Sequence, residues 1–233
     1  MNTFQLRRIA IAALALLVCT AVGAAEEPQT WDGLTRMKAK RMDAVFLLPG
    51  AVFTGYTGVV IEEPVEVALR ENWQRDVNRS QRSPSRKVTD EQVQKMRTEV
   101  AEALPPIFAK EFEKAGWTIA PAPGPNVLAL RSAVINIDVA APDTPSAGRV
   151  KTYTFDAGSA TLAIEVRDSQ TRQLLGRAVD ARTTPGSSGT MEWSTSVSNR
   201  ADFQALFREW SRIIVNGLDD LKEGAQPKPL AGK

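Results

Sequence analysis

The chain has 233 residues, which is enough for one domain with a substantial core. Its first 25 residues contain two arginines and no acidic residue. The rest of the chain carries 27 basic and 27 acidic side chains, so its net charge is zero. A neutral domain lacks the electric field expected of a nucleic-acid-binding protein. The chain has no histidine, which excludes nucleophiles activated by histidine and zinc bound by histidine. Its single cysteine is Cys19, so the rest of the chain has no thiol chemistry. We therefore expect no cofactor and no metal.

Residues 1–25 have the order of a secretory leader. Arg7 and Arg8 are followed by an apolar run over residues 9–18 and then by small residues that end at Ala25. The apolar run is shorter than the roughly 20 residues that a comfortable membrane span requires. We therefore expect a signal peptide over residues 1–25 and export of the mature chain.

Cys19 supports a second interpretation of the leader. Bacterial lipoproteins are cut immediately before a cysteine that follows leucine and small residues, and here Cys19 follows Leu16, Leu17 and Val18. Val18 is bulky where a small residue is preferred, so ordinary cleavage is favoured over lipidation. The predicted location is the periplasm, with anchoring to the outer membrane, and any membrane association, only if Cys19 is lipidated.

Residues 26–43 and 224–233 lack an apolar pattern. We expect them to be an N-terminal linker and a disordered tail on either side of one domain over residues 44–223. The first clear strand of this domain covers residues 57–67, where apolar residues recur at every second position and Pro64 interrupts the pattern. No internal repeat or linker divides the domain.

A helix is predicted after a solvated loop. The loop covers residues 78–87, which are rich in serine and arginine and contain no apolar residue. The helix begins where Thr89 and Gln92 form a capping box, and apolar residues follow at helical spacing. Pro105 and Pro106 predict a kink or a restart within this helix.

Three strands and a second helix complete the pattern. A strand over residues 126–139 is expected to bury its odd-numbered apolar positions. Residues 160–166 alternate between core and solvent, and residues 174–181 form the return strand. The last helix, over residues 199–223, carries an apolar stripe that faces the core.

The turn between the last two of these strands contains Asp168 and Arg172. Asp168 can accept hydrogen bonds from backbone groups that follow it, which initiates a turn. Arg172 stands where glycine is usual in such loops, so we expect it at positive φ. Glu165 and Arg167 then point away from the core, because a register slip of one residue would bury both charges.

Together these elements predict one α+β domain. We expect a mostly antiparallel sheet of about four strands with two helices packed on one face, in the order β-α-β-β-β-α. A domain of this size can bury a sufficient core without the disulfides that the mature chain lacks.

Without histidine, carboxylates are the main candidates for acid–base chemistry. Glu62, Glu63 and Glu66 form the densest acidic cluster, and Asp219 and Asp220 form a second pair. Glycosidases hold two carboxylates about 5 to 10 Å apart, which positions on one strand face can approach. A solvated edge is the more ordinary role of such acids, so no catalytic residue is assigned.

Two groups of residues are candidates for a partner surface. Basic residues in and beside the serine-rich loop can meet an anionic envelope component, and two tryptophans lie in or beside loops. The alternative is that the charges keep a loop soluble and that the tryptophans bury one. The candidates are Trp73, Arg79, Arg82, Arg86, Lys87 and Trp193.

Four segments occur in the order of a known family. They are GYTGVVIEEPVEV from Gly55, PGPNVLALRSAVINI from Pro123, GSATLAIEVRDSQTRQLLGRAVDAR from Gly158 and FQALFREWSRII from Phe203. Over residues 43–221 the chain resembles Domain of Unknown Function 3313, a group of Gram-negative envelope proteins of which many are lipoproteins. The resemblance implies an exported α+β domain and no established activity, so no catalytic residue is carried over. Val18 and Arg172 depart from the family, which has a stronger lipidation box and a glycine in the turn.

The sequence therefore favours a non-catalytic exported cell-envelope protein. We expect it to bind or scaffold an envelope protein or an anionic envelope component, and not to bind nucleic acid. A carboxylate-dependent hydrolase of envelope glycans is the first alternative, and an accessory subunit of an envelope transporter is the second.

Overall fold

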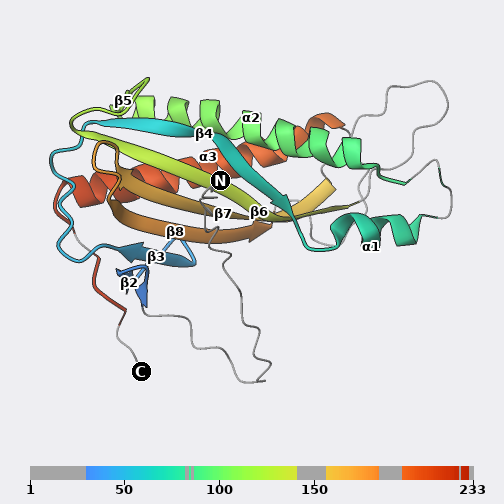
Figure 1. Ribbon diagram of the computed structural model, residues 1–233, viewed down its shortest axis with the longest axis horizontal. Helices are drawn as coiled ribbons and strands as arrows, with labels where there is room; N and C mark the ends of the chain where they lie inside the picture. Colours follow the sequence, from blue (N-terminus) through green and yellow to red (C-terminus); the bar gives the residue numbers. More distant parts are fainter. Residues whose placement is uncertain are drawn as a thin grey trace, which may run out of the picture.

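The computed structural model describes residues 30–81, 84, 87–140, 156–183, 196–225 and 227–230. These residues form one mixed sheet of eight strands with three helices, and the long helices α2 and α3 lie on the same face of the sheet (Figure 1). The strands are β1 (Thr30–Trp31), β2 (Leu34–Met37), β3 (Ala44–Leu47), β4 (Gly58–Leu69), β5 (Thr118–Ile119), β6 (Val127–Ala140), β7 (Asp156–Asp168) and β8 (Leu174–Thr183). The helices are α1 (Trp73–Ser80), α2 (Asp90–Lys114) and α3 (Ser196–Lys222).

The α+β class is confirmed, but the predicted antiparallel sheet of four strands is wrong. The strand order is β1-β2-β3-β8-β7-β6-β4-β5, and β4 runs parallel to both β5 and β6. A parallel pair requires a long crossover, and here α1 and α2 provide it between β4 and β6. The additional strands β1, β2, β3 and β5 have two to four residues each, too few for an alternating pattern to predict them.

The predicted hairpin of β7 and β8 is confirmed. Leu162, Ile164 and Val166 are buried in the core, while Glu165 and Arg167 are half-buried on the other face. The two strands pair antiparallel, and Arg172 in their turn has a φ of 62°.

Strand β6 buries a different set of positions from the one predicted. Its first half buries the even-numbered Leu128, Leu130 and Val134, whereas the prediction placed the odd-numbered positions in the core. A register shift between Ile135 and Asp138 then changes the phase, and Asn136 within it has a φ of 52°. A β-bulge inserts an extra residue, so the predicted Ile137 and Val139 are buried after it, and of the predicted positions before it only Ala129 is buried.

Helix α2 begins as predicted and continues through its two prolines. Thr89 and Gln92 form the capping box, and the helix runs without a break for 25 residues. The predicted restart at the prolines is therefore wrong. A proline inside a helix costs about 3 kcal/mol, and the burial of Leu104, Pro105 and Phe108 offsets part of that cost.

The first part of the stretch predicted as a loop is helical. Helix α1 includes residues 78–80, and its Asn78 side chain exchanges two hydrogen bonds with the backbone of Val88, at 2.7 and 2.9 Å. These bonds close the end of α1 onto the segment that leads into α2. The order of residues 78–80 thus depends on a contact ten residues away, which local composition does not reveal.

Both predicted end segments contribute to the sheet. Strand β2 lies within the predicted linker, and its Leu34 is fully buried. The backbone N–H of Lys38 donates to the carbonyl of Lys228 at 2.9 Å, and that of Leu230 donates to the carbonyl of Arg36 at the same distance. Residues 227–230 therefore pair with β2, and the prediction of a disordered tail is wrong for them. The predicted leader, with Cys19, lies outside the described residues.

Candidate functional site

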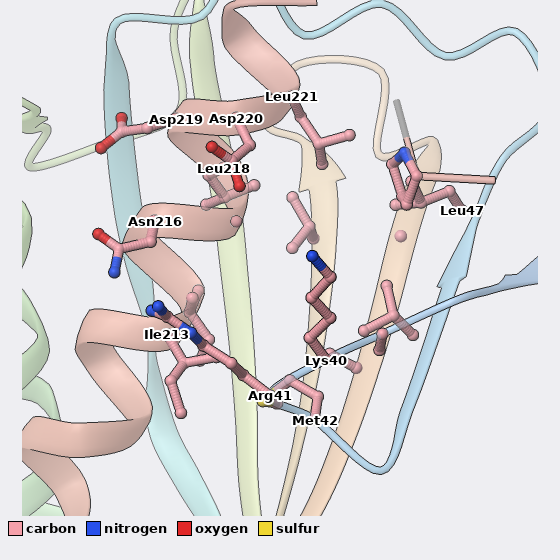
Figure 2. Close-up of a pocket in the computed structure, with 18 of the residues that line it drawn as sticks. Lys40, Arg41, Met42, Leu47, Ile213, Asn216, Leu218, Asp219, Asp220 and Leu221 are labelled. Carbon is pink, nitrogen blue, oxygen red and sulfur yellow. The ribbon is translucent and has the colours of Figure 1, made fainter. Parts of the chain in front are cut away.

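A pocket of about 930 Å³ lies at the end of the sheet that carries β3 and β8 (Figure 2). Helix α2 packs on β4 and helix α3 packs on β7, so the helix-side face of β8 and β3 extends beyond both helices. The pocket occupies this space. Its other walls are residues 38–42, between β2 and β3, and residues 225, 227 and 228 of the C-terminal segment.

Apolar side chains from the sheet and from α3 form the base of the pocket. Val45, Ala178 and Ile164 are direct neighbours across β3, β8 and β7 and continue the helix-side face of the sheet. We call this set the pocket floor, and its members are Val45, Leu47, Phe53, Ile164, Val166, Ala178, Ile214, Leu218 and Leu221.

Four exposed cationic side chains are among the residues that line the pocket. We call Lys38, Lys40, Arg41 and Lys228 the pocket rim. In the part of the chain that the structure describes, none of the four forms an ion pair with a carboxylate. Figure 2 shows Lys40 reaching into the pocket between α3 and the strands, with Arg41 beside Ile213.

Two carboxylates also line the pocket, on the last turns of α3. Asp219 accepts a hydrogen bond from the indole of Trp117 at 2.7 Å, which joins α3 to the end of α2. Asp220 lies next to it on the helix, beside Leu218 in Figure 2. Neighbouring residues on a helix point in directions about 100° apart, so these two carboxylates do not face each other across a substrate.

A buried carboxylate holds the wall of the pocket in place. Asp180 of β8, 3% exposed, accepts hydrogen bonds from the Trp210 indole at 2.8 Å, from the Asp43 backbone at 3.1 Å and from the Arg182 guanidinium. Arg182 also donates to the carbonyl of Arg41 at 3.0 Å. Burial opposes the charge of Arg182, but Asp180 and Glu209 together outweigh this and raise the pKa of Arg182. The rim segment is thereby fixed to β8 and α3.

The opposite, helix-free face of the sheet carries a row of alternating charges. Glu62, Arg131, Glu165 and Arg177 lie opposite one another across β4, β6, β7 and β8. Glu165 accepts hydrogen bonds from Arg177 and from Arg167 on its own strand. Burial of Glu165 opposes its ionisation, but these bonds outweigh it and hold the pKa of Glu165 below its ordinary value.

The predicted acidic cluster lies at the end of this row and is largely neutralised. Glu62 pairs with Arg172, and Glu66 pairs with Arg131. Glu63 is exposed on β4. Glu62 and Glu66 therefore lie on an arginine-rich surface on the face away from the pocket, whereas the second candidate pair, Asp219 and Asp220, lines the pocket.

The predicted partner-surface residues are not brought together. Trp73 is 1% exposed and its indole donates to the carbonyl of Val139 at 2.8 Å, so its proposed surface role is wrong and its burial in the core explains its presence beside a loop. Arg79 and Lys87 are exposed near α1, on the opposite side of the molecule from β3 and the pocket (Figure 1). Arg82, Arg86 and Trp193 lie outside the described residues.

Sequence reasoning missed the pocket rim because its first three members lie in the predicted linker. The signal was present as the run RMKAKRM over residues 36–42, which places four basic side chains beside two methionines. A short run of this kind has neither a helical nor a strand period, so only tertiary contacts show that it is ordered.

Neither a cluster of metal ligands nor a membrane-spanning helix is found among the described residues. Nowhere among them do three or more histidine, cysteine, aspartate or glutamate side chains gather as metal ligands would. None of the helices in these residues combines the length and the apolar character needed to cross a bilayer.

The fold and the pocket define an α+β protein that carries a cavity at one end of its sheet. The chain belongs to the family described as "Protein of unknown function (DUF3313)", which matches residues 25–214. This confirms the resemblance drawn from the four sequence segments. No curated protein matches the chain.

Several solved structures are similar to the chain at a distance. A PelC dodecamer from Paraburkholderia phytofirmans is 12% identical, with 72% of this chain and 96% of that chain covered and a TM-score of 0.34. A DUF330 protein from Xanthomonas campestris is 14% identical, with 79% and 96% covered and a TM-score of 0.33. A DUF4136 family protein from Bacteroides thetaiotaomicron is 11% identical, with 78% and 98% covered and a TM-score of 0.31. Likenesses of this size say nothing about a shared ligand or activity.

Proposed function

We propose that the protein is a non-catalytic, exported cell-envelope module that binds a ligand or partner in its pocket. The pocket itself carries the proposal, because a concave apolar surface beside cations that form no ion pair among the described residues is a typical setting for a ligand site. Its wall is fixed by Asp180 and Arg182, and binding to a preformed site avoids the cost of ordering one.

The surroundings of the carboxylates support a non-catalytic role. A general acid in a glycosidase needs a raised pKa, so that it keeps its proton near neutral pH. Hydrogen bonds from arginines instead lower the pKa of Glu165, and Glu62 and Glu66 are paired with arginines as well. These groups suit an ionised surface better than a proton donor.

Site-specific photo-crosslinking in intact cells tests this proposal. A photoreactive amino acid replaces Met42, which lines the pocket, and in a control variant it replaces Thr161, which is equally half-buried but on the opposite face of β7. We expect a discrete adduct at Met42 and none at Thr161. Absence of an adduct at Met42, or the same adduct at both positions, contradicts a binding role for the pocket.

A further inference from the structure

We propose that the pocket binds a single-chain anionic amphiphile, with the acyl chain against the pocket floor and the anionic head group at the pocket rim. This inference rests on the proposed function, since it names the chemical class of the ligand for the same pocket. It follows from two features that occur together at this pocket: a continuous apolar surface, and a set of cations that form no ion pair among the described residues.

The pocket floor is suited to an acyl chain. It runs from Val45 of β3 across Ala178 and Ile164 to Leu218 of α3, and all of its members have apolar side chains. Its volume of about 930 Å³ falls within the range of roughly 300 to 1,000 Å³ that small-molecule sites occupy. An apolar chain gains by leaving water for such a surface, whereas an inorganic anion or a sugar would leave the floor uncovered.

The pocket rim is suited to an anionic head group. On the helix-free face, Arg131, Arg172 and Arg177 are each paired with a carboxylate, so that face is neutralised internally. The four rim cations have no such partner among the described residues, although two carboxylates lie nearby. The hydrogen bond from the uncharged indole of Trp117 leaves Asp219 ionised, and four cations against two carboxylates still give an excess of positive charge. Unpaired cations beside an apolar cavity favour an anionic group on an apolar chain.

A fatty acid and a lysophospholipid share this chemistry, and competition separates them. The purified protein is first bound to dansyl-labelled undecanoate, whose fluorescence rises in an apolar site. Oleate, lysophosphatidylglycerol and the uncharged methyl oleate are then added as competitors. We expect displacement by one or both anionic competitors, and the better of the two identifies the head group. Failure of both, or equal displacement by methyl oleate, overturns the proposal.

Gly217 allows the pocket to be blocked without damage to the fold. It lies within α3 and lines the pocket, and a Cβ placed on it would meet nothing within 4 Å. Gly217→Leu therefore projects a side chain into open space and also raises helix propensity. We expect binding of the probe to weaken by at least about tenfold while the melting temperature stays the same or rises. Unchanged binding in this variant overturns the proposal.

A second variant tests the charges of the pocket rim. Lys40→Gln combined with Arg41→Gln removes two cations, and we expect probe binding to weaken on the order of tenfold. Lys110→Gln is the matched control, because Lys110 is exposed on α2 and has no carboxylate partner among the described residues. Equal binding by the double variant and the control overturns the proposal.

The outcomes also separate this proposal from the proposed function. If Met42 still forms its adduct in cells while no anionic amphiphile binds, the protein remains a binding module and the ligand belongs to another class, such as a peptide. If Met42 forms no adduct and no amphiphile binds, both proposals fail.

Discussion

Arg172 affects stability in two opposite ways, through a strained backbone and through an ion pair with Glu62. Its φ of 62° lies in the left-handed region, which costs a non-glycine residue about 1 kcal/mol. Its guanidinium pairs with Glu62, but half of the arginine side chain remains exposed, so solvent screens the pair and its contribution to stability is small. The local sequence indicated the strained backbone, whereas the pairing with a residue on β4 appears only in the folded structure.

Replacing Arg172 with glycine separates the two contributions. In the wild type, Arg172→Gly removes both the strain and the ion pair, so we expect a change in the free energy of unfolding of less than about 1 kcal/mol. In a Glu62→Gln background only the strain is removed, and we expect a gain of about 1 kcal/mol. Denaturant melts of the four proteins in this cycle give both values. A loss of stability in the Glu62→Gln background would contradict the strain assigned to Arg172.

The same turn fixes the ionisation of Tyr56. Its hydroxyl donates to Asp168 at 2.8 Å, and burial, this bond and the negative charge of Asp168 raise the pKa of Tyr56 to about 12. Hydrogen bonds from the turn, led by the Thr171 backbone, lower the pKa of Asp168 and keep it charged. The raised pKa means that the phenol contributes stability in full below its unfolded pKa near 10. This contribution is lost as the pH rises through about 12.

A pH-jump absorbance titration measures this ionisation before the chain unfolds. We expect one phenol of the wild type to ionise at about pH 12, and this component to disappear in Tyr56→Phe. Asp168→Asn removes the negative charge, so the pKa of Tyr56 should fall toward 10. An unchanged titration in Asp168→Asn would show that burial alone raises the pKa.

At the scale of elements, patterns that depend on neighbouring residues were predictable. The alternation in β7, the capping box of α2 and the turn at Asp168 all arise within a few residues, and each is confirmed. Elements that depend on distant partners were not predictable. The parallel pairing of β4 with β6 spans a two-helix crossover, and β5 has two residues whose order comes from β4.

The wall of the pocket is a clearer example of structure that depends on distant residues and that the sequence pattern does not predict. Residues 38–43 have no period of their own, and they are held by Asp180, which lies 137 positions from Asp43 along the chain. The basic run that forms the rim was therefore visible in the sequence, while its order and its position beside α3 were not. The prediction of the buried positions in β6 was wrong for a third reason, because the bulge at Asn136 changes which positions of the strand face the core.

Strand β4 carries the acids considered for hydrolysis, and their substitution tests that alternative. Changing Glu62, Glu63 and Glu66 together to glutamine breaks two ion pairs that are partly exposed. We expect the free energy of unfolding to fall by no more than about 2 kcal/mol and the envelope glycan profile to stay unchanged. The measurements are a denaturant melt and glycan analysis of cells that express the variant. An altered glycan profile with unchanged stability would favour the hydrolase.

At the scale of the whole molecule, the two faces of the sheet are used differently. On the helix-free face, arginines and carboxylates neutralise one another in rows across the strands. On the helix face, α2 and α3 cover the centre of the sheet and leave its β3 and β8 end open, where the cations stay unpaired. The overhang of the sheet beyond α3 therefore creates both the cavity and the charge imbalance around it.

The distance between this pocket and a membrane depends on how the leader is processed. Cleavage after Ala25 leaves a short segment before β1, and the domain is then released from the membrane. Lipidation of Cys19 would instead leave residues 20–29 as a tether with a fully extended reach of at most roughly 35 Å. A tether of that length holds the domain within about one molecular diameter of the lipid surface.

Intact mass spectrometry of the protein recovered from cells decides between these forms. We expect a mass that corresponds to a chain starting near Glu26, because Val18 is unfavourable for lipidation and small residues precede Glu26. A mass that includes a diacylglyceryl-modified Cys19 contradicts the released form and places the pocket beside the membrane, where anionic amphiphiles are abundant. An uncut chain that begins at Met1 contradicts export, because the leader would then have no function as a signal.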